Sequence, residues 1–253
     1  MSRQWKPKHF ILLLIAFFYS SPYANAQDLT IFFDIWPPYN YIESGKTVGI
    51  STELIETALK NTNIKYKLVQ HPFKRAILTV ETTPYTMVYT VARIPQREDA
   101  FTWIGPLHPR KVYLYKLKER TDIQIANVED IKKYHTGALS GGSVEQFFIA
   151  NGFHTSRYYL ANSSEQLVRM LFAERIDLIP GDQLDIAFLI NCMEYDYSRI
   201  EVAYLLDEEG GYYLAANKNT PHDTLEKLQK SLNKVLATGF KDEIIKKYVK
   251  QLK

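Results

Sequence analysis

The sequence has almost no cysteine, because Cys192 is the single one in 253 residues. One cysteine excludes an intrachain disulfide, so stability must come from packing and not from cross-links. With 46% hydrophobic residues, the chain is long enough for one large domain or two smaller domains, each with its own core. No cysteine stands directly after Ala26, the end of a candidate export signal, so we expect no lipid anchor on the mature chain.

The sequence also lacks a long hydrophobic run near its basic start. Phe10–Phe18 (FILLLIAFF) is apolar throughout, but a helix that spans a bilayer needs about 20 such residues. Three basic residues precede this run, and Ala24-Asn25-Ala26 follows it as a small-residue cleavage signal. We therefore predict that residues 1–26 are a cleaved secretory signal peptide and that the mature chain is a soluble periplasmic protein.

An excess of positive charge is missing from the predicted mature chain. Removing Arg3, Lys6 and Lys8 from the 31 basic residues leaves 28, which equals the 28 acidic residues. Proteins that bind nucleic acid without sequence preference carry a clear basic excess, so we expect no nucleic-acid partner. The six histidines show no spacing typical of metal ligands, so we predict no metal and no cofactor.

The sequence does contain short apolar runs that alternate with helical patterns. Leu29–Phe33, Lys65–Val69 and Thr86–Thr90 are β-prone, and helical apolar spacing separates them, with Ser51 as the expected N-cap of the first helix. Strand, helix, strand, helix, strand predicts a parallel sheet flanked by helices. A similar series that starts at His135–Leu139 predicts a second α/β unit.

Two arginines four residues apart follow the third expected strand. Arg93 and Arg97 flank Pro95, which opposes a continuing helix, so this segment is expected to be a loop or a single turn that can point into a cleft. A guanidinium group presents five N–H donors in a rigid fork and stays charged, which suits two-point recognition of a carboxylate. The alternative is that both arginines are solvated surface charges. The aromatic run that follows is expected to stop as a strand at Gly105-Pro106.

Several segments in a fixed order carry a resemblance to a known family. They are Trp36-Pro37-Pro38-Tyr39, Gly45–Ile50, Ile94-Pro95-Gln96-Arg97, Phe101–Leu107 and Arg175–Asp182. Together they resemble the periplasmic solute-binding proteins of polar amino acid uptake systems, which are extracellular solute-binding family 3 with the type 2 periplasmic binding fold. The resemblance runs from about Leu29 to Val249. Ala92 departs from the pattern, because many members offer a ligand-binding hydroxyl group there.

The resemblance implies an α/β fold of two lobes, each with a parallel or mixed sheet flanked by helices, joined by a two-strand hinge. Lobe 1 is expected from residues 27–110 plus 207–253, and lobe 2 from residues 111–206. The implied function is capture of a small polar ligand, an amino acid or another small carboxylate, between the lobes for an ABC-type uptake system. The implied partner is a membrane permease, and the protein itself is expected to be a monomer.

The resemblance also implies which residues contact the ligand. Arg97 carries over as the group that binds the α-carboxylate, the turn at Gly142 and Ser143 completes that grip, and Asp182 receives the ammonium group. The backbone of this turn is expected to present N–H groups to the anion at a helix N-terminus. The other expected contacts are Asp34, Trp36, Tyr39, Phe73 and Arg93. The alternatives are core packing for the three aromatic residues and an N-cap role for Asp182, while Asp177 is expected to be structural.

Other functions stay open from the sequence alone. Periplasmic cyclohexadienyl dehydratases share this fold and carry out acid–base elimination, which needs a cleft carboxyl group with a raised pKa. Glu145 is the candidate for that group, but nothing in its spacing marks it, and we predict no enzyme. A ligand sensor that acts on a membrane receptor is a further alternative. Ala92 and Leu139 replace polar positions of many amino acid binders, which leaves other small polar ligands open.

Export is predicted to remove residues 1–26. N-terminal sequencing of the protein recovered from the periplasm should find Gln27 first, because cleavage is expected after the Ala24-Asn25-Ala26 signal. Recovery of the chain in the membrane fraction, with its hydrophobic segment retained, would contradict this prediction.

Overall fold

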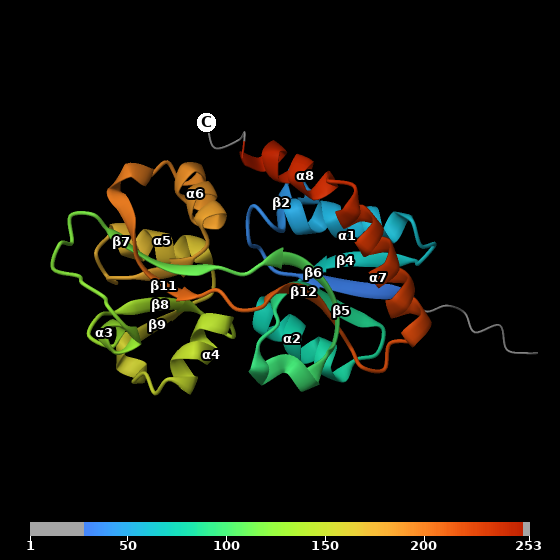
Figure 1. Ribbon diagram of the computed structural model, residues 1–253, viewed down its shortest axis with the longest axis horizontal. Coiled ribbons are helices and arrows are strands. Elements are labelled where there is room, and N and C mark those ends of the chain that lie inside the picture. Colours follow the sequence, from blue (N-terminus) through green and yellow to red (C-terminus); the bar gives the residue numbers. More distant parts are fainter. Residues whose placement is uncertain (1–27, 250–253) are drawn as a thin grey trace, which may run out of the picture.

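The computed structural model describes residues 28–249, whose elements form two lobes that lie beside each other (Figure 1). Lobe 1 is the part built on the sheet that contains β1, and lobe 2 is the part built on the sheet that contains β7. The predicted signal peptide, residues 1–26, lies outside the described residues. In the described range, no helix is both long enough and apolar enough to cross a membrane.

Lobe 1 is organised on a five-stranded sheet with the strand order β4-β1-β5-β12-β6. β1 runs parallel to β4 and β5, whereas β12 runs antiparallel to β5 and β6. The strands are β1 (Leu29–Phe33), β4 (Tyr66–Gln70), β5 (Thr86–Ala92), β6 (Thr102–Pro109) and β12 (Gly211–Ala216). The parallel series predicted from the N-terminal segment is therefore joined by a strand from the C-terminal part of the chain.

Both faces of this sheet are apolar, as expected for a sheet covered on both sides. Successive side chains of a strand point to opposite faces, and β1 shows this: Ile31 and Phe33 belong to the core under α1, α7 and α8, while Phe32 packs with α2. The helices are α1 (Ile50–Lys60), α2 (Phe73–Thr82), α7 (His222–Ala237) and α8 (Phe240–Val249), with the hairpin β2 (Tyr41–Glu43) and β3 (Lys46–Val48) and the 3-10 helix η1 (Pro95–Ala100).

Two local predictions in lobe 1 are wrong. Ser51 is not the N-cap of α1; Gly49 is, and Ser51 is buried inside the helix with its hydroxyl 2.9 Å from a ring nitrogen of His108. β6 does not stop at Gly105-Pro106 but continues to Pro109. The strand tolerates this interruption because its register against β12 shifts there, and because the side-chain amide of Gln229 in α7 binds both the N–H and the carbonyl of Gly105.

Lobe 2 contains an antiparallel sheet with the order β10-β7-β11 and a parallel pair, β8 and β9. On β7, Tyr115 and Leu117 belong to the core with α5 and α6, while Val112 and Leu114 pack with α3 and α4. The strands are β7 (Val112–Leu117), β8 (Thr136–Leu139), β9 (Tyr158–Ala161), β10 (Ile179–Gly181) and β11 (Ile200–Asp207). The helices are α3 (Val128–Ile131), α4 (Ser143–Ala150), α5 (Ser164–Phe172) and α6 (Gln183–Cys192), with 3-10 helices η2 (Thr155–Arg157) and η3 (Tyr197–Arg199).

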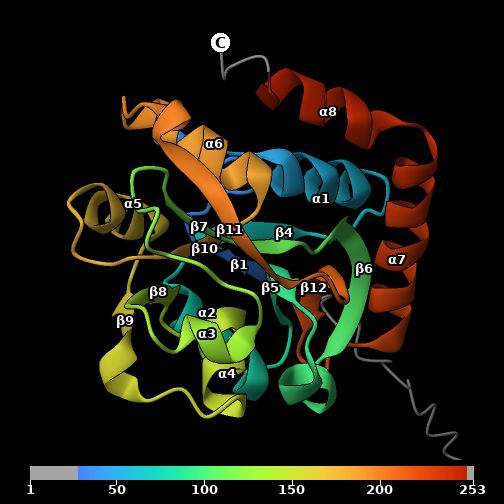
Figure 2. The same cartoon turned by 60° about the vertical axis from the view of Figure 1, so that its left-hand side comes forward.

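Two short segments connect the lobes, residues 110–111 between β6 and β7 and residues 208–210 between β11 and β12 (Figure 2). Arg110 in the first segment is 2% exposed and forms an ion pair with Asp207, at 2.5 Å, at the end of β11. Its guanidinium group also donates to the hydroxyl of Ser143 in lobe 2, at 3.3 Å. One buried cation therefore binds both connections together. The predicted lobe limits at 110/111 and 206/207 stay a prediction.

The two neighbouring ion pairs of the connections should differ strongly in their effect on stability. Arg110→Met should lower the free energy of unfolding by about 3–5 kcal/mol, because it leaves the carboxylate of Asp207 partly buried without its cation. Lys111→Met is the matched control, because Lys111 and Glu208 are both more than half exposed and such pairs contribute about 0–1 kcal/mol. Urea unfolding of both variants measures the difference, and equal losses would contradict the prediction.

Candidate ligand-binding cleft

A cleft of about 640 Å³ lies between the lobes. Lobe 1 contributes the ends of β1 and β5 with the loops that follow them, and lobe 2 contributes the starts of α4, α5 and α6. The carboxyl ends of parallel strands are where open α/β sheets bind their ligands. Of the nine predicted contact residues, seven line this cleft: Asp34, Trp36, Phe73, Arg97, Gly142, Ser143 and Asp182.

Arg97 lies in η1 and is 8% exposed, because Pro95 opens this single turn and directs the chain back toward the cleft. Its guanidinium group donates to the carbonyl oxygens of Ala92, at 3.3 Å, and Gly141, at 2.5 Å. The same group lies 5.3 Å from the centre of the Phe73 ring. Burial, and then the charge of Arg110, lowers the pKa of Arg97 to about 10, so the group is still a cation at neutral pH.

The glycine turn after β8 is arranged differently from what we expected. The N–H of Gly141 donates to the carboxylate of Glu145, and the N–H of Gly142 donates to the carbonyl of Leu139. The amides of Gly141 and Gly142 are therefore occupied within the turn itself and do not point to an incoming anion, while the predicted ligand contact of Ser143 stays a prediction. The carbonyl oxygen of Gly141 accepts a hydrogen bond from the guanidinium group of Arg97, and this contact connects lobe 2 to lobe 1. Glu145 is not among the residues that line the cleft.

Asp34 ends β1 and organises the first loop of the cleft. Its carboxylate oxygens accept hydrogen bonds from the backbone N–H groups of Ile35, at 2.8 Å, and Phe73, at 2.9 Å. The second contact fixes the start of α2, which places the Phe73 ring beside the cation of Arg97. Burial raises the pKa of Asp34 despite these two donors.

Two aromatic residues of lobe 1 reach across the cleft to two carboxylates of lobe 2. The indole N–H of Trp36 donates to Asp185 at 2.8 Å, and the hydroxyl of Tyr39 donates to Asp182 at 2.7 Å. The ring centres of Trp36 and Tyr39 are 4.8 Å apart, and Trp36 meets the buried ring of Tyr212 edge-on at 5.0 Å. Tyr39 is 7% exposed and packs in the lobe 1 core, which is the alternative considered for it, while its predicted contact with a ligand stays a prediction.

Asp182 has the N-cap role that the sequence offered as the alternative, and it also lies in the cleft. One carboxylate oxygen accepts from the backbone N–H groups of Leu184 and Asp185, at 2.8 and 2.9 Å, which makes it the N-cap of α6. The other oxygen faces lobe 1 and accepts from Tyr39. Burial raises the pKa of Asp182. A cap and a cleft contact are compatible because the two oxygens of one carboxylate accept separately.

The sequence analysis missed Asp185, a second carboxylate in the cleft wall. It is 3% exposed, and one of its oxygens has no hydrogen-bond partner among the described residues. Burial and the neighbouring charge of Asp182 raise the pKa of Asp185 well above its ordinary value. An acidic residue in the first turn of a helix is so common that the sequence offers no signal for a site here.

Thr90 and Tyr212 line the cleft and were also missed. Thr90 has φ 60°, a left-handed conformation that is an outlier for a β-branched residue. Its hydroxyl donates to the side chain of Asn40 at 2.6 Å, which holds β5 to the Trp36 loop. Such strain is found at binding sites because the surrounding structure has to maintain it. The threonine in a β-prone run gave no sign of this from the sequence.

Arg93 does not lie in the cleft. Its side chain forms a surface ion pair with Glu98, and its guanidinium group lies over the rings of Trp103 and Tyr213, at 5.8 and 5.3 Å from their centres. These contacts correspond to the solvated role that was the alternative for this arginine. The two arginines of this loop therefore differ in exposure: Arg97 is buried and faces lobe 2, whereas Arg93 lies at the surface.

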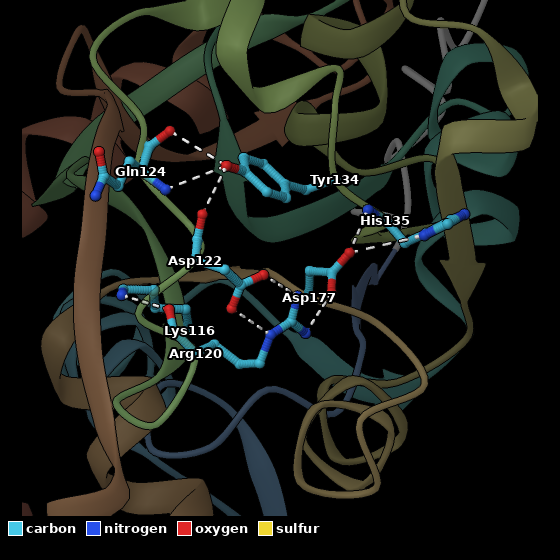
Figure 3. Close-up of polar contacts among 7 residues, drawn as sticks. All are labelled: Lys116, Arg120, Asp122, Gln124, Tyr134, His135 and Asp177. Atoms are coloured by element: carbon cyan, nitrogen blue, oxygen red, sulfur yellow. Dashed lines mark hydrogen bonds and ion pairs between the residues drawn. The ribbon is translucent and has the colours of Figure 1, made fainter.

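Asp177 lies in lobe 2 and binds structural partners (Figure 3). Its carboxylate receives Arg120 at 2.6 Å and the backbone N–H of His135 at 2.8 Å. Arg120 in turn bridges to Asp122. Across residues 28–249, no group of three or more histidine, cysteine, aspartate or glutamate side chains is placed to hold a metal ion.

Comparison with known proteins gives a consistent picture. A model of the bacterial extracellular solute-binding proteins, family 3, matches residues 29–251. A probable histidine-binding protein of Campylobacter jejuni is 25% identical over 218 residues, which are 84% of this chain and 81% of that protein.

Solved structures share the fold at lower identity. An arginine-, lysine-, histidine-binding protein of Geobacillus stearothermophilus has a TM-score of 0.75 at 15% identity, with 88% of this chain and 95% of that chain covered. A histidine kinase sensor domain similar to periplasmic binding proteins has a TM-score of 0.76 at 14% identity, with coverage of 88% and 96%. The predicted two-lobed type 2 periplasmic binding fold is thereby confirmed.

The raised pKa of Asp185 predicts how the empty protein responds to pH. An aspartate titrates near pH 4 in the unfolded chain, so a raised pKa in the fold contributes stability at low pH that is lost as pH rises through the folded value. Asp185→Asn removes this pH-dependent loss of stability, because the asparagine side chain does not titrate. The free energy of unfolding of the variant should rise relative to wild type as pH rises from 5 to 8, by at most about 1.4 kcal/mol per pH unit.

Thermal unfolding of the ligand-free protein measures this effect. Asp196→Asn is the control, because Asp196 is exposed and its contacts with Ser198 lower its pKa. Asp196 is therefore ionised in both the folded and the unfolded chain above pH 5, and the difference between this variant and wild type should stay constant from pH 5 to 8. An Asp185→Asn protein whose difference from wild type does not change between pH 5 and 8 would contradict the prediction.

Proposed function

The chain belongs to the bacterial extracellular solute-binding proteins, family 3, and from this membership we propose that it captures a small amino-acid-like ligand between its lobes. Arg97 receives the carboxylate group of the ligand, and Asp182 receives its ammonium group. The observation that carries the proposal is the placement of these two opposite charges in one cleft, each from a different lobe. A zwitterion held between them stabilises the closed arrangement of the lobes, because it binds both lobes at once.

Arg97 is suited to an anion that comes from outside the chain. Among the described residues, it forms no ion pair with an aspartate or glutamate, and its hydrogen bonds go to two backbone carbonyl groups. A buried cation without a counter-ion is costly, so a carboxylate that enters the cleft gains more here than at the surface. The rigid fork of donors favours a carboxylate in two-point contact.

Asp182 is suited to the ammonium group for the corresponding reason. Its outward oxygen accepts a single hydrogen bond from the phenol of Tyr39, which is neutral because burial raises its pKa well above the ordinary value. An ammonium group brings a full positive charge to the same oxygen, and charge-assisted hydrogen bonds are roughly twice as strong as neutral ones. The ligand therefore replaces a weaker contact that already spans the cleft.

The cellular role follows from the family and the export signal. We propose that the protein is secreted to the periplasm and that its closed form delivers the ligand to the membrane permease of an ABC-type transporter. For an elimination enzyme, the candidate acid Glu145 does not fit, because its carboxylate is bound by the backbone of Gly141 and lies outside the cleft lining. The cleft carboxyl groups with a raised pKa are Asp34, Asp182 and Asp185, and in this proposal Asp182 binds the ligand and Asp34 holds the first loop.

Substitution of Arg97 tests the proposal. Isothermal titration of the mature protein with individual L-amino acids should give binding that Arg97→Ala weakens by about 2–5 kcal/mol, which is roughly thirtyfold to several thousandfold. Arg97→Lys should not restore full affinity, because an ammonium group cannot form the planar two-point contact. Unfolding curves of both variants show whether they are folded.

Arg93→Ala is the matched control from the same loop. Its partner is the exposed carboxylate of Glu98, so its removal should leave ligand affinity within about threefold of wild type. Unchanged affinity in folded Arg97→Ala, or equal losses in the two variants, would remove the basis for the proposed carboxylate contact.

A further inference from the structure

Asp185 carries a buried oxygen that the fold leaves unsatisfied. One oxygen accepts from the indole of Trp36, while the other has no partner in the described part of the chain, although the side chain is 3% exposed. Most buried polar atoms in native proteins are hydrogen-bonded, and an exception requires an explanation. The residue lines the cleft, so a ligand is one such explanation.

The backbone beneath Asp185 leaves room for it. A Cβ atom at Gly181, the last residue of β10, would lie 2.8 Å from the unsatisfied oxygen and 2.4 Å from the side chain of Ile186. Any larger residue at position 181 would therefore push the carboxylate out of its place. The start of α6 thus holds Asp182 and Asp185 in the same wall, three residues apart.

No cation of the described chain balances this pair of carboxylates. None of the ion pairs among residues 28–249 includes Asp182 or Asp185. Arg97 is bound to the turn at Gly141, and Arg110 is neutralised by Asp207. Asp34 lines the same cleft, but its oxygens are bound by two backbone amides. Lys74 also lines the cleft, so three acidic side chains, Asp34, Asp182 and Asp185, stand there with two basic ones, Lys74 and Arg97. Lys74 forms no ion pair with Asp182 or Asp185 among the described residues.

Aromatic rings stand next to the two carboxylates. Trp36, Tyr39 and Tyr212 form a connected group with ring centres 4.8 to 6.5 Å apart, and two of them donate to the carboxylates themselves. Aromatic faces attract cations through their quadrupole, most strongly for tryptophan and where water is excluded. Carboxylates combined with aromatic walls are the chemistry of a site for an organic cation.

We propose that Asp185 forms, with Asp182 and the rings of Trp36 and Tyr212, a subsite for a second cationic group of the ligand, and that the empty subsite holds a proton which the ligand displaces. This inference rests on the proposed function and refines it. The ligand has an ammonium or guanidinium group besides its α-ammonium group. Asp182 takes one cation and Asp185 the other, and a neutral side chain of the same shape is discriminated against.

The groups around Asp185 explain why a proton is held in the empty cleft. On its own helix it faces Asp182, which has the same charge. From the other elements it faces Tyr39, Tyr115 on β7 and Tyr212 on β12, and burial raises the pKa of each of these phenols, so they stay neutral. The charge of Arg110 lowers the pKa of Tyr212 and so opposes the effect of burial, but Arg110 itself forms an ion pair with Asp207. When the ligand cation arrives, the O–H bond of the carboxylic acid breaks, the proton goes to solvent and the carboxylate binds the cation.

The experiment compares three probes that differ by one group each. L-Citrulline has the shape of L-arginine without the positive side chain, and agmatine has the guanidinium group without the carboxylate. Calorimetric titration of wild type should show L-arginine binding tighter than L-citrulline by on the order of thirtyfold or more. Asp185→Asn, which keeps an oxygen for Trp36, should reduce this preference to within about threefold, mainly through loss of arginine affinity.

Proton release is a second readout that a purely structural role would not change. Titration of wild type with L-arginine, in two buffers with different ionisation enthalpies, should show release of up to about one proton, and the affinity should rise with pH by at most about tenfold per unit between pH 5 and 8. Asp185→Asn should release less than half as much. This measurement on wild type also tests the inference if the variant fails to fold.

The outcomes separate the inference from the proposed function. L-Citrulline that binds as tightly as L-arginine, or arginine binding without proton release, would overturn the subsite and leave the proposed function intact. Agmatine that binds in an Asp185-dependent way, without binding of either amino acid, would support the subsite and refute the carboxylate contact at Arg97. Binding of none of the three probes would overturn the inference.

Discussion

Buried charge without an opposite charge beside it is the constraint on which this structure depends. Arg97 on one side of the cleft and Asp185 on the other are buried, Asp182 is partly buried, and no described residue forms an ion pair with any of them. In our proposal Asp185 holds a proton until the ligand cation arrives, so that its charge appears only on binding. The fold keeps the cation and the carboxyl groups apart because they belong to different lobes. They do not form an ion pair with each other, so each is available to a ligand that lies between them. The neutral donors Trp36 and Tyr39 and the carbonyl groups of Ala92 and Gly141 keep these charges partly solvated in the meantime. A protein with unpaired buried charges in its cleft is less stable without a ligand than with a ligand that pairs with them.

The rest of the fold maintains the separation and permits its release. The cation of Arg110 binds both connections between the lobes, and its contact with Ser143 continues into the wall of the cleft. The strained conformation of Thr90 is held by Asn40, whose own amide donates to the carbonyl of Asp34 at 2.6 Å. The connection and the first loop are therefore held by an ion pair and by hydrogen bonds at the points where they meet the cleft.

The fold could be predicted from the sequence in more detail than the site. Runs such as Leu29–Phe33 are apolar on both faces, which requires helices on both sides, and the order of motifs indicated the family. Arg97 was found because a proline turn and its neighbours marked it, and Asp182 because it ends a strand. Asp185 could not be found, since an acid in the first turn of a helix is expected for the helix dipole alone. The amides of the Gly141 turn were misjudged because Glu145, one helical turn later, reaches back to occupy one of them. Such contacts depend on rotamers and on neighbours from the other lobe, which spacing in one sequence does not contain.

In the proposed function, a ligand replaces hydrogen bonds that already exist across the cleft, and selectivity depends on how its contacts compare with the ones that it replaces. Trp36 and Tyr39 already join the lobes through the two carboxylates, so the net gain on binding is the difference between the ligand's contacts and those it replaces. A neutral hydrogen-bonding group that displaces the phenol of Tyr39 exchanges one neutral donor for another and gains little. A cation gains the attraction of a carboxylate in a site with little water, where the electrostatic interaction is strongest. Every ligand must therefore break the same cross-lobe hydrogen bonds, which costs a similar free energy each time. Ligands that carry the complementary charges regain more free energy than this cost.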